Sequence, residues 1–226
     1  MSTALVVAAA GKGTRLRSKT PKPFVSVLGK PLFIRTLERV AGSFRFQEIV
    51  VAADPDQLDR VRHLLVRYHI QARVVAGGKT RAESVRNAVH SLPASVRWVA
   101  IHDAARPFVS ARLVRNVLAA ARMTGAAICG LAPTATVKKV SKAGRVLRTE
   151  DRQELVLVQT PQVFDLGKLR DRYQALGDKA LGCTDEAALF DGSRTQVVCV
   201  PGEPFNIKIT TPEDRRLMTF LIGEKL

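Results

Sequence analysis

A glycine-rich segment near the start of the chain combines small residues with basic ones. Its small residues are Ala9, Ala10, Gly11 and Gly13, and Arg15 and Lys22 follow them. Small side chains let backbone N–H groups approach an anion, and nearby cationic side chains neutralise phosphate charge. Neither the dinucleotide nor the Walker pattern is present, because Leu16 stands where the first needs a third glycine and the Walker spacing is absent. We predict a phosphate-binding loop, with a plain tight turn as the alternative.

A second group of chemically capable residues runs from His102 to Pro107 and directly follows an apolar stretch. Ligands of open α/β sheets bind at the carboxyl ends of strands, so Asp103 is expected at a ligand site. A carboxylate there can hold Mg²⁺ beside a triphosphate. The alternative is a local ion pair between Asp103 and Arg106, or a helix cap. His102 is more typical of a packed histidine at a strand end than of a catalyst.

Other polar clusters recur along the chain. They comprise Gly77 and Gly78 with Ser84, Gln159–Gln162, Thr184–Glu186 and Asn206–Thr210. The first marks a strand–glycine–helix transition, whose backbone and Ser84 hydroxyl could contact the edge of a base. Each of the others alone is typical of a cap, a turn or a solvated edge. Their joint order along one chain is not explained in that way.

The elements that would position these residues are short apolar runs alternating with amphipathic stretches. The predicted strands cover 4–9, 48–53, 72–75, 98–102 and 126–132, and the predicted helices cover 58–65, 113–121 and a final segment that begins at Thr211. This alternation is typical of an α/β domain with a mainly parallel sheet. Residues 136–149 interrupt it, because they are polar, β-prone and basic around a turn at 141–144. A two-stranded hairpin is marginal alone, so we expect it to rest on its own domain or on a second subunit, which makes a dimer plausible.

Composition excludes several classes of protein. The 226 residues are 46% hydrophobic and 25% charged, which is ordinary for a globular chain and excludes wholesale disorder. No apolar run approaches the ~20 residues that span a bilayer, and no signal pattern is evident, so we expect no membrane association. Three scattered cysteines argue against a disulfide framework or a structural zinc and favour a cytoplasmic location. The net charge of +16 favours anionic partners, and the low aromatic content of 5% favours phosphorylated small molecules over nucleic acid.

Taken together, these blocks resemble the 2-C-methyl-D-erythritol 4-phosphate cytidylyltransferase family over essentially the whole chain. The matching residues are Ala9-Ala10-Gly11-x-Gly13-x-Arg15, Pro21-Lys22, Gly77-Gly78-x-x-Arg81-x-x-Ser84-Val85, His102–Pro107, Asp151-Arg152, Thr160-Pro161-Gln162, Thr184-Asp185-Glu186 and Asn206-Ile207-Lys208. The resemblance implies a Rossmann-like nucleotidyltransferase domain with a mainly parallel sheet and a projecting β-arm. It also implies a single domain over 1–226, with 134–152 as an arm that interlocks two subunits of a homodimer. The reaction would join CTP and methylerythritol phosphate to give the CDP-linked alcohol and pyrophosphate.

The resemblance also implies roles for individual residues. Arg15 and Lys22 would neutralise the triphosphate and the departing pyrophosphate, Lys208 the α-phosphoryl group, and Asp103 would position Mg²⁺. Ala9, Ala10, Gly11, Gly13, Gly78, Ser84 and Ala104 would line the nucleotide site. Thr136 and Arg152 would bind the acceptor phosphate across the dimer interface, and Arg106, Thr160 and Thr184 would line the sugar-alcohol side. A phosphate monoester is already anionic at neutral pH, since its second pKa is about 6, so no general base is required.

Two positions depart from the family pattern, and three other functions compete. Lys79 stands where some members carry an acidic residue near the base, and Ala135 where many carry aspartate. A ribitol 5-phosphate cytidylyltransferase shares most of the blocks, although the Ala104-Ala105 pair favours the methylerythritol enzyme. A basic nucleic-acid-binding module would explain the charge but lacks a recognised motif. An inactive sugar-nucleotide binder is disfavoured because the basic residues and Asp103 are retained together.

Overall fold

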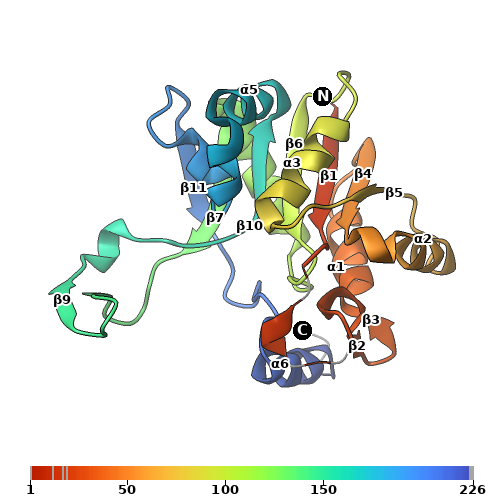
Figure 1. The fold of residues 1–226 in the computed structure, drawn as a ribbon, viewed down its shortest axis with the longest axis horizontal. Helices are drawn as coiled ribbons and strands as arrows, with labels where there is room; N and C mark the ends of the chain where they lie inside the picture. Colours follow the sequence, from red (N-terminus) through yellow and green to blue (C-terminus); the bar gives the residue numbers. More distant parts are fainter. Residues whose placement is uncertain (1, 12, 17, 19, 224–226) are drawn as a thin grey trace.

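The computed structural model describes residues 2–11, 13–16, 18 and 20–223, and a seven-stranded sheet forms its centre (Figure 1). The strands of this sheet are β1 (Thr3–Ala8), β4 (Glu48–Ala53), β5 (Arg73–Ala76), β6 (Trp98–Asp103), β7 (Ala126–Leu131), β10 (Leu157–Asp165) and β11 (Val197–Pro201). The α-helices are α1 (Leu32–Ala41), α2 (Leu58–Arg67), α3 (Arg81–Ser91), α4 (Ala111–Thr124), α5 (Leu166–Leu176) and α6 (Pro212–Gly223). Two separate two-stranded sheets pair β2 (Ser26–Val27) with β3 (Lys30–Pro31) and β8 (Lys138–Val140) with β9 (Val146–Thr149).

The order of strands in the central sheet is β11-β7-β10-β6-β1-β4-β5. Every pairing is parallel except those of β10, which runs antiparallel to both β6 and β7. The mainly parallel α/β sheet predicted from the sequence is therefore confirmed. The chain proceeds from β1 outward to β4 and β5 and then returns to β6 on the other side of β1. The direction of winding thus changes between β1 and β6, which is where open α/β sheets bind ligands.

The predicted elements agree closely with the observed ones. Each of the five predicted strands matches an observed strand to within one residue at either end. Ser110 caps α4 by accepting a hydrogen bond from the Leu113 N–H at 3.0 Å, and Thr211 caps α6 by accepting one from the Asp214 N–H at 3.2 Å. The sequence does not predict strands at 157–165 or 197–201, where the structure has β10 and β11.

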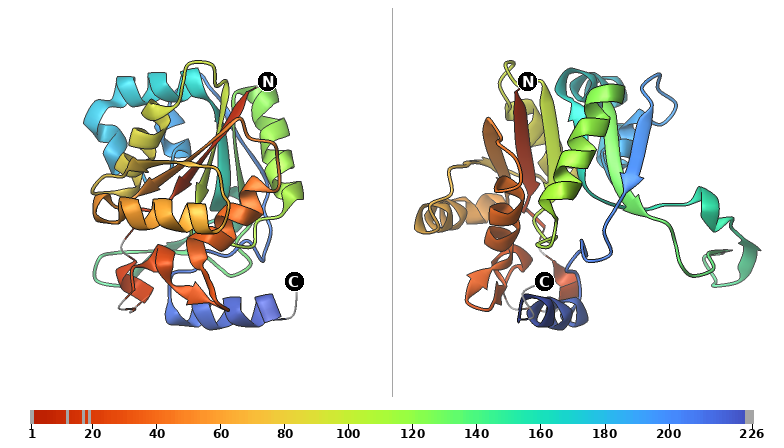
Figure 2. Two further views of the ribbon diagram at one scale, coloured as in Figure 1. Left: turned by 90° about the vertical axis from the view of Figure 1, so that its right-hand side faces the viewer. Right: turned by 180° about the vertical axis from the view of Figure 1, so that it is seen from behind.

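Helices cover both faces of the sheet (Figure 2). On one face α1, α2 and α4 pack on alternate residues of the strands, such as Leu5 and Val7 of β1. On the other face α3 and α5 pack on the intervening residues, such as Ala4 and Val6. Strands that are buried on both faces read as continuous apolar runs, which is why the strand segments of this sequence lack polar alternation.

A smaller apolar cluster attaches the C-terminal helix beside the end of the sheet. Met218 and Leu221 of α6 pack with Ile209, Val25 and Leu32, and all five side chains are almost completely buried. This cluster holds the segment before α6 against the segment that follows the glycine-rich loop. It therefore brings together two basic residues that are distant in sequence, Lys22 and Lys208.

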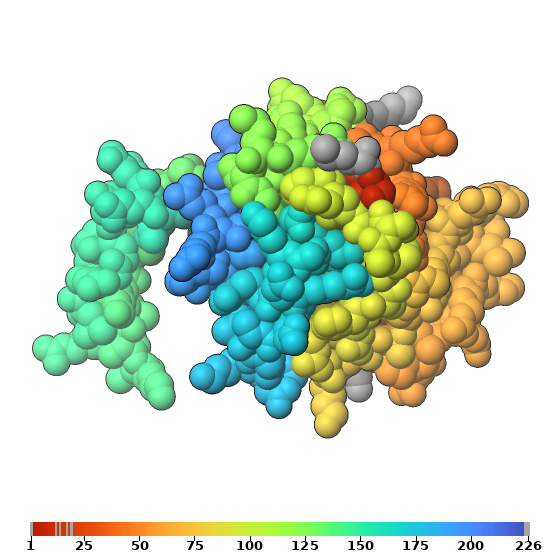
Figure 3. Space-filling view, turned by 90° about the horizontal axis from the view of Figure 1, so that it is seen from above, coloured from red at the N-terminus to blue at the C-terminus, as the bar shows by residue number. Residues whose placement is uncertain are grey.

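The segment in which a hairpin was predicted contains the antiparallel pair β8 and β9, with Lys138 opposite Thr149. Figures 1 and 3 show residues 134–156, coloured green to cyan, standing away from the rest of the molecule. Val140, Val146 and Leu147 on this hairpin are 53%, 58% and 56% exposed. Among the described residues, no helix is long and apolar enough to cross a membrane.

Candidate active site

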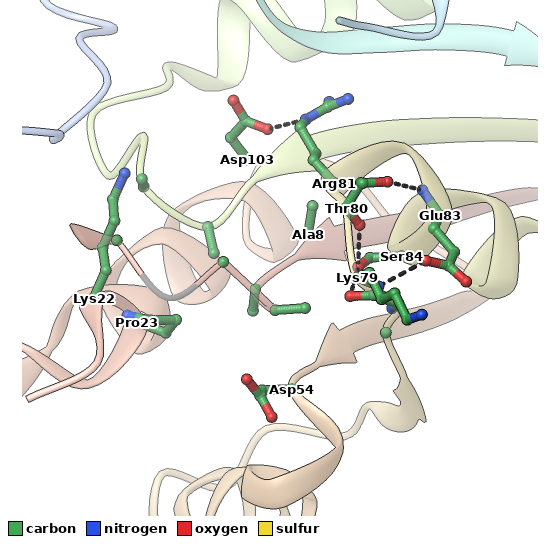
Figure 4. Close-up of a pocket in the computed structure, with 18 of the residues that line it drawn as sticks. Ala8, Lys22, Pro23, Asp54, Lys79, Thr80, Arg81, Glu83, Ser84 and Asp103 are labelled. Carbon is green, nitrogen blue, oxygen red and sulfur yellow. Dashed lines mark hydrogen bonds and ion pairs between the residues drawn. The ribbon is translucent and has the colours of Figure 1, made fainter. Parts of the chain in front are cut away.

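A pocket of about 860 Å³ opens at the carboxyl ends of β1, β4, β5 and β6. Its lining includes all of the residues predicted to bind the nucleotide, to act in catalysis or to hold a metal, namely Ala9, Ala10, Gly11, Gly13, Arg15, Lys22, Gly78, Ser84, Asp103, Ala104 and Lys208. In Figure 4, Asp103 and Arg81 lie on one side of this pocket, Asp54 lies opposite, and Lys22 and Ser84 lie at its two ends. Five segments that are separated in sequence thus converge at the switch point of the sheet.

The glycine-rich loop is shaped to let Lys22 approach it. Gly13 has a φ of +68°, and a Cβ at this position would collide with the side chain of Lys22. Both the left-handed backbone and the close approach therefore require glycine. Lys22 begins a short 3₁₀ helix (Lys22–Phe24), whose Pro23 and Phe24 are buried.

The electrostatic environment of Lys22 is unfavourable for a cation. Burial lowers the pKa of the Lys22 ammonium to about 8, and repulsion by Lys208 adds to that effect while Asp103 opposes it. An ammonium that is partly desolvated and close to other cations gains when an anion arrives. An anion bound at this basic end of the pocket would therefore stabilise the charged form of Lys22.

Asp103 lies at the end of β6 and is held by cations on both carboxylate oxygens. Arg81 Nε donates to Asp103 Oδ1 at 2.9 Å, and Lys208 Nζ lies 2.7 Å from Oδ2. Burial alone would raise the pKa of this carboxyl, but Arg81 and Lys208 outweigh burial and hold its pKa well below the usual range. Asp103 is thus ionised at any physiological pH. The predicted alternative, a pair with Arg106, is present only as a longer contact of 3.8 Å.

Lys208 is positioned by the backbone on either side of it. The N–H of Ile209 donates to the carbonyl of Ala105 at 2.8 Å. Asn206 is fully buried, and its side-chain amide donates to the carbonyl of Thr160 at 2.8 Å. These hydrogen bonds on either side of Lys208 fix its backbone, so the Asn206-Ile207-Lys208 motif places the Lys208 ammonium next to Asp103.

The start of α3 forms the opposite end of the pocket. Thr80 caps the helix by accepting a hydrogen bond from the Glu83 N–H at 3.1 Å, and the Glu83 carboxylate accepts one from the Lys79 N–H at 2.7 Å. The Ser84 hydroxyl donates to the carbonyl of Thr80 at 2.7 Å and accepts from the Gly78 N–H at 3.0 Å. In this structure Ser84 therefore fixes the glycine turn, and Glu83 lies across Gly78, where a Cβ would collide with it.

The residues predicted for the acceptor side do not line this pocket. Arg106 is buried and donates to the carbonyl of Asn206 at 2.7 Å, while Thr160 is buried and its hydroxyl lies 3.1 Å from His102 Nδ1. Thr184 is exposed on the segment before a 3₁₀ helix at Ala187–Phe190. Thr136 and Arg152 are exposed at the base of the hairpin. Within the described part of the chain, Arg106 and Thr160 both lie beside Asp103, with Arg106 Nε 3.8 Å from Oδ2 and the Asp103 N–H donating to the Thr160 hydroxyl at 3.1 Å, whereas Thr136, Arg152 and Thr184 lie on exposed segments.

His102 has the structural role that its sequence position favours. It is completely buried, and its Nε2 lies 3.1 Å from the carbonyl of Arg106. Burial lowers the pKa of His102 to about 4, so the ring is neutral at physiological pH. A neutral, fully hydrogen-bonded ring orients its neighbours, and the interpretation of His102 as a packed histidine is confirmed.

Two charged residues of the site were given no role by the sequence. Arg81 lines the pocket and contacts Asp103, and Glu186 is 1% exposed and accepts two hydrogen bonds from Arg81. Both occur in the motifs that were recognised, which is the only signal that could have drawn attention to them. Asp54, Lys79 and Thr80 also line the pocket.

The donor set around Asp103 fits a magnesium ion that arrives with a nucleotide. Among the described residues there is no group of three His, Cys, Asp or Glu side chains that could hold a metal ion. Mg²⁺ commonly binds through one or two carboxylates and substrate phosphates, keeping several waters. One ionised carboxylate beside a basic pocket matches that pattern. For Mg²⁺ to bind Asp103 Oδ2, Lys208 would have to release its contact with that oxygen.

Comparison with known proteins identifies the family. The model of the family described as IspD, 2-C-methyl-D-erythritol 4-phosphate cytidylyltransferase, matches residues 3–224. This chain belongs to that family. A curated cytidylyltransferase of that name from Solibacter usitatus is 38% identical, with 100% of this chain and 97% of the relative covered. Another from Clostridium botulinum (strain 657) is 34% identical, with 98% and 96% covered.

Solved structures agree with the assignment to the cytidylyltransferase family. The 4-diphosphocytidyl-2C-methyl-D-erythritol synthase from Anaerococcus prevotii superimposes with a TM-score of 0.86 at 28% identity, covering 98% of each chain. The 2-C-methyl-D-erythritol 4-phosphate cytidylyltransferase from Thermus thermophilus gives a TM-score of 0.78 at 31% identity, covering 99% of this chain and 100% of that one. The family resemblance predicted from the motifs is confirmed, and the nucleic-acid-binding and ribitol alternatives are not favoured.

Proposed function

We propose that this chain, as a single cytidylyltransferase domain over 1–226, transfers the cytidylyl group of CTP to 2-C-methyl-D-erythritol 4-phosphate and releases pyrophosphate. The observation that carries the proposal is the composition of one pocket, in which a glycine-rich loop, five basic side chains and the ionised Asp103 meet. Family membership supplies the nucleotide and the acceptor. A cytoplasmic location, expected from the sequence, remains part of the proposal.

In the reaction, an oxygen of the acceptor phosphate attacks the α-phosphorus of CTP. A P–O bond to the acceptor forms, the bond between the α-phosphorus and the bridging oxygen breaks, and pyrophosphate leaves with that oxygen. The acceptor phosphate is largely dianionic at neutral pH, so the enzyme needs no base to remove a proton. The obstacle is repulsion between two polyanions, which is overcome by positioning and by cations aimed at the developing charge.

The basic residues of the pocket are proposed to meet that requirement. Arg15 and Lys22, beside the glycine-rich loop, would bind the β- and γ-phosphates and the departing pyrophosphate. Lys208 would leave Asp103 and contact the α-phosphoryl group. The backbone at Ala9–Gly11 and Gly13 would approach the phosphates, and Gly78, Ser84 and Ala104 would enclose the cytidine.

Mg²⁺ is proposed as the divalent partner of CTP, held by Asp103 and by phosphate oxygens. When bound, it would neutralise phosphate charge and fix the triphosphate geometry. Asp103 meets the requirement for a ligand because it is ionised and 8% exposed at its side chain, at the edge of the pocket.

The acceptor site is proposed to be completed by a second copy of the chain. Thr136 and Arg152 lie at the base of the hairpin, where Arg152 Nη1 donates to the carbonyl of Thr134 at 2.5 Å. A guanidinium can bind a phosphate through two parallel hydrogen bonds. The exposed apolar residues of the hairpin support a homodimer in which the hairpin packs on the partner, with Arg106, Thr160 and Thr184 on the sugar-alcohol side.

The test is pyrophosphate release from CTP and Mg²⁺ with 2-C-methyl-D-erythritol 4-phosphate as the acceptor. Turnover is expected with this acceptor and not with ribitol 5-phosphate. A preference for ribitol 5-phosphate, or no release with either acceptor, would contradict the proposed function.

A further inference from the structure

Arg81 joins the active-site carboxylate to a second carboxylate outside the pocket lining. Its Nε donates to Asp103 Oδ1 at 2.9 Å, and its Nη1 donates to Glu186 Oε1 and Oε2 at 2.9 and 3.0 Å. The two carboxylate side chains are 8% and 2% exposed, and that of Arg81 is 26% exposed. Glu186 is further fixed by its own N–H, which donates to the side chain of Gln162 at 3.2 Å.

Arg81 and Lys208, the two cations within 3 Å of Asp103, differ in how they are held, while Arg106 Nε lies farther away at 3.8 Å from Oδ2. Arg81 has two anionic partners, one at the end of β6 and one in the segment before the 3₁₀ helix at Ala187–Phe190, and its pKa is raised because Glu186 and Asp103 outweigh the effect of burial. Lys208 contacts Asp103 through one ammonium, and its side chain is 36% exposed. A polyanion that enters the pocket can therefore draw Lys208 away from Asp103 much more easily than it can draw Arg81.

The four side chains of this network carry two acidic and two basic groups. Asp103 and Glu186 are the anions, and Arg81 and Lys208 are the cations. Burial raises the pKa of the Glu186 carboxyl above its usual range, and the adjacent Arg81 guanidinium opposes that effect. Both oxygens of Glu186 lie within hydrogen-bond distance of the same guanidinium nitrogen, Nη1.

We propose that Glu186 is a positioning residue that acts through Arg81. Its carboxylate binds one side of the guanidinium, so that Arg81 orients Asp103 Oδ1 without taking both oxygens, and Oδ2 becomes available when Lys208 turns to phosphate. The inference rests on the proposed function, because it assumes that Asp103 receives a divalent cation together with CTP. Without the charge of Glu186, Arg81 would pair wholly with Asp103, and the pocket would carry one extra positive charge.

This arrangement predicts that removing the charge of Glu186 has opposite effects on CTP affinity without Mg²⁺ and on the gain in affinity that Mg²⁺ produces. Glu186→Gln keeps the shape of the side chain and removes its charge. CTP without divalent cation should bind more tightly to this variant, because the pocket is more positive. The factor by which Mg²⁺ increases the affinity for CTP should fall roughly 10- to 100-fold, which is the usual effect of losing a group that orients a metal ligand. A purely structural role would weaken binding in both conditions.

The matched control is Glu48→Gln. Glu48 also pairs with an arginine, accepting hydrogen bonds from Arg73 Nε and Nη2, but it lies at the amino-terminal ends of β4 and β5, at the opposite edge of the sheet from the pocket. Calorimetric titration of CTP with and without Mg²⁺ should give wild-type values for this variant. It controls for the removal of one negative charge from a strongly basic protein.

The outcomes separate the inference from the proposed function. Opposite changes in Glu186→Gln, absent from Glu48→Gln, would support the inference. Equal weakening in both conditions, no change, or no effect of Mg²⁺ on the wild-type protein would overturn it. If Glu186→Gln does not fold, Arg81→Lys provides the same test, because one ammonium cannot span both carboxylates, and the Mg²⁺ effect should again fall. Failure of the wild type to release pyrophosphate would refute the proposed function, while the binding data would still decide the inference.

Discussion

Replacing Lys22 with methionine should make the protein more stable while removing most of its activity. Methionine keeps the length of the side chain and eliminates a charge that is costly to bury. The pKa of the Lys22 ammonium falls from 10.5 to about 8, first because of burial and then because of repulsion by Lys208. The folded protein therefore tolerates this charge at the expense of stability, as residues of active sites often do.

The size of the effect follows from the change in pKa. One pKa unit corresponds to about 1.4 kcal/mol, so the fall from 10.5 to about 8 corresponds to about 3 kcal/mol. Partial contact with solvent reduces the usable part, and we expect a gain of about 2–3 kcal/mol in the free energy of unfolding at pH 7. For a chain of this length, that gain raises the Tm by roughly 4–12 °C.

The gain should depend on pH in a defined direction. Below pH 8 both the folded and the unfolded wild-type chain carry the proton, so the full cost is present. Between pH 8 and 10.5 the unfolded chain binds a proton that the folded protein has lost, so the stability contributed by Lys22 rises with pH. The advantage of Lys22→Met is therefore largest near neutral pH and disappears toward pH 10.5.

The assay is urea unfolding followed by circular dichroism at about pH 7 and about pH 10. Lys179→Met, at an exposed position, is the control and should change the free energy of unfolding by less than about 0.5 kcal/mol. Equal or lower stability of Lys22→Met at pH 7, or an advantage that is the same at both pH values, would refute the reasoning. Turnover should fall by a factor on the order of 10²–10³.

Further predictions concern the same pocket and the hairpin. In the wild type, kcat/KM for CTP should decline as pH rises through about 8, because free Lys22 loses its charge; a flat profile to pH 9 would contradict this. Lys208→Ala should lower kcat on the order of 10²-fold or more in steady-state kinetics, and a near-normal rate would remove Lys208 from the transition state. Arg152→Ala should raise the KM for the acceptor about tenfold or more with a smaller change in kcat; an unchanged KM would exclude it from phosphate binding. Sedimentation should give a dimer for the wild type and a monomer for Leu147→Asp, and an active wild-type monomer would exclude a shared site.

The nucleotide pocket could be predicted from sequence because its residues are attached to elements with strong local signals. Asp103 ends one apolar strand and the glycine-rich loop follows another, and parallel strands bring their carboxyl ends to the same edge. Once the strands were recognised, the meeting of these groups followed from topology. The close packing of Gly13 against Lys22 is the same kind of local constraint.

The Arg81–Glu186 pair was beyond the reach of such reasoning. The two residues are 105 positions apart, and their contact depends on how the segment before Ala187–Phe190 folds over α3. A charged residue in a sequence is normally predicted to be solvated, and only the packed structure reveals that Glu186 is buried. The antiparallel insertion of β10 between β6 and β7 likewise depends on long-range pairing.

The residues proposed to bind the acceptor could not be placed together from the sequence for a different reason. Arg106 and Thr160 are buried in hydrogen bonds within one chain, and Thr136 and Arg152 lie at the base of the hairpin. Neither a single sequence nor a single chain shows which residues a second copy would add to a site. These assignments therefore depend on the kinetic and sedimentation experiments above.

The most direct test of the account is steady-state pyrophosphate release by the wild-type protein with each of the four nucleoside triphosphates, Mg²⁺ and 2-C-methyl-D-erythritol 4-phosphate. The account predicts turnover with CTP and a kcat/KM for the other three that is lower by orders of magnitude. Equal use of all four nucleotides, or no release with CTP, would contradict the assignment of the pocket to cytidylyl transfer.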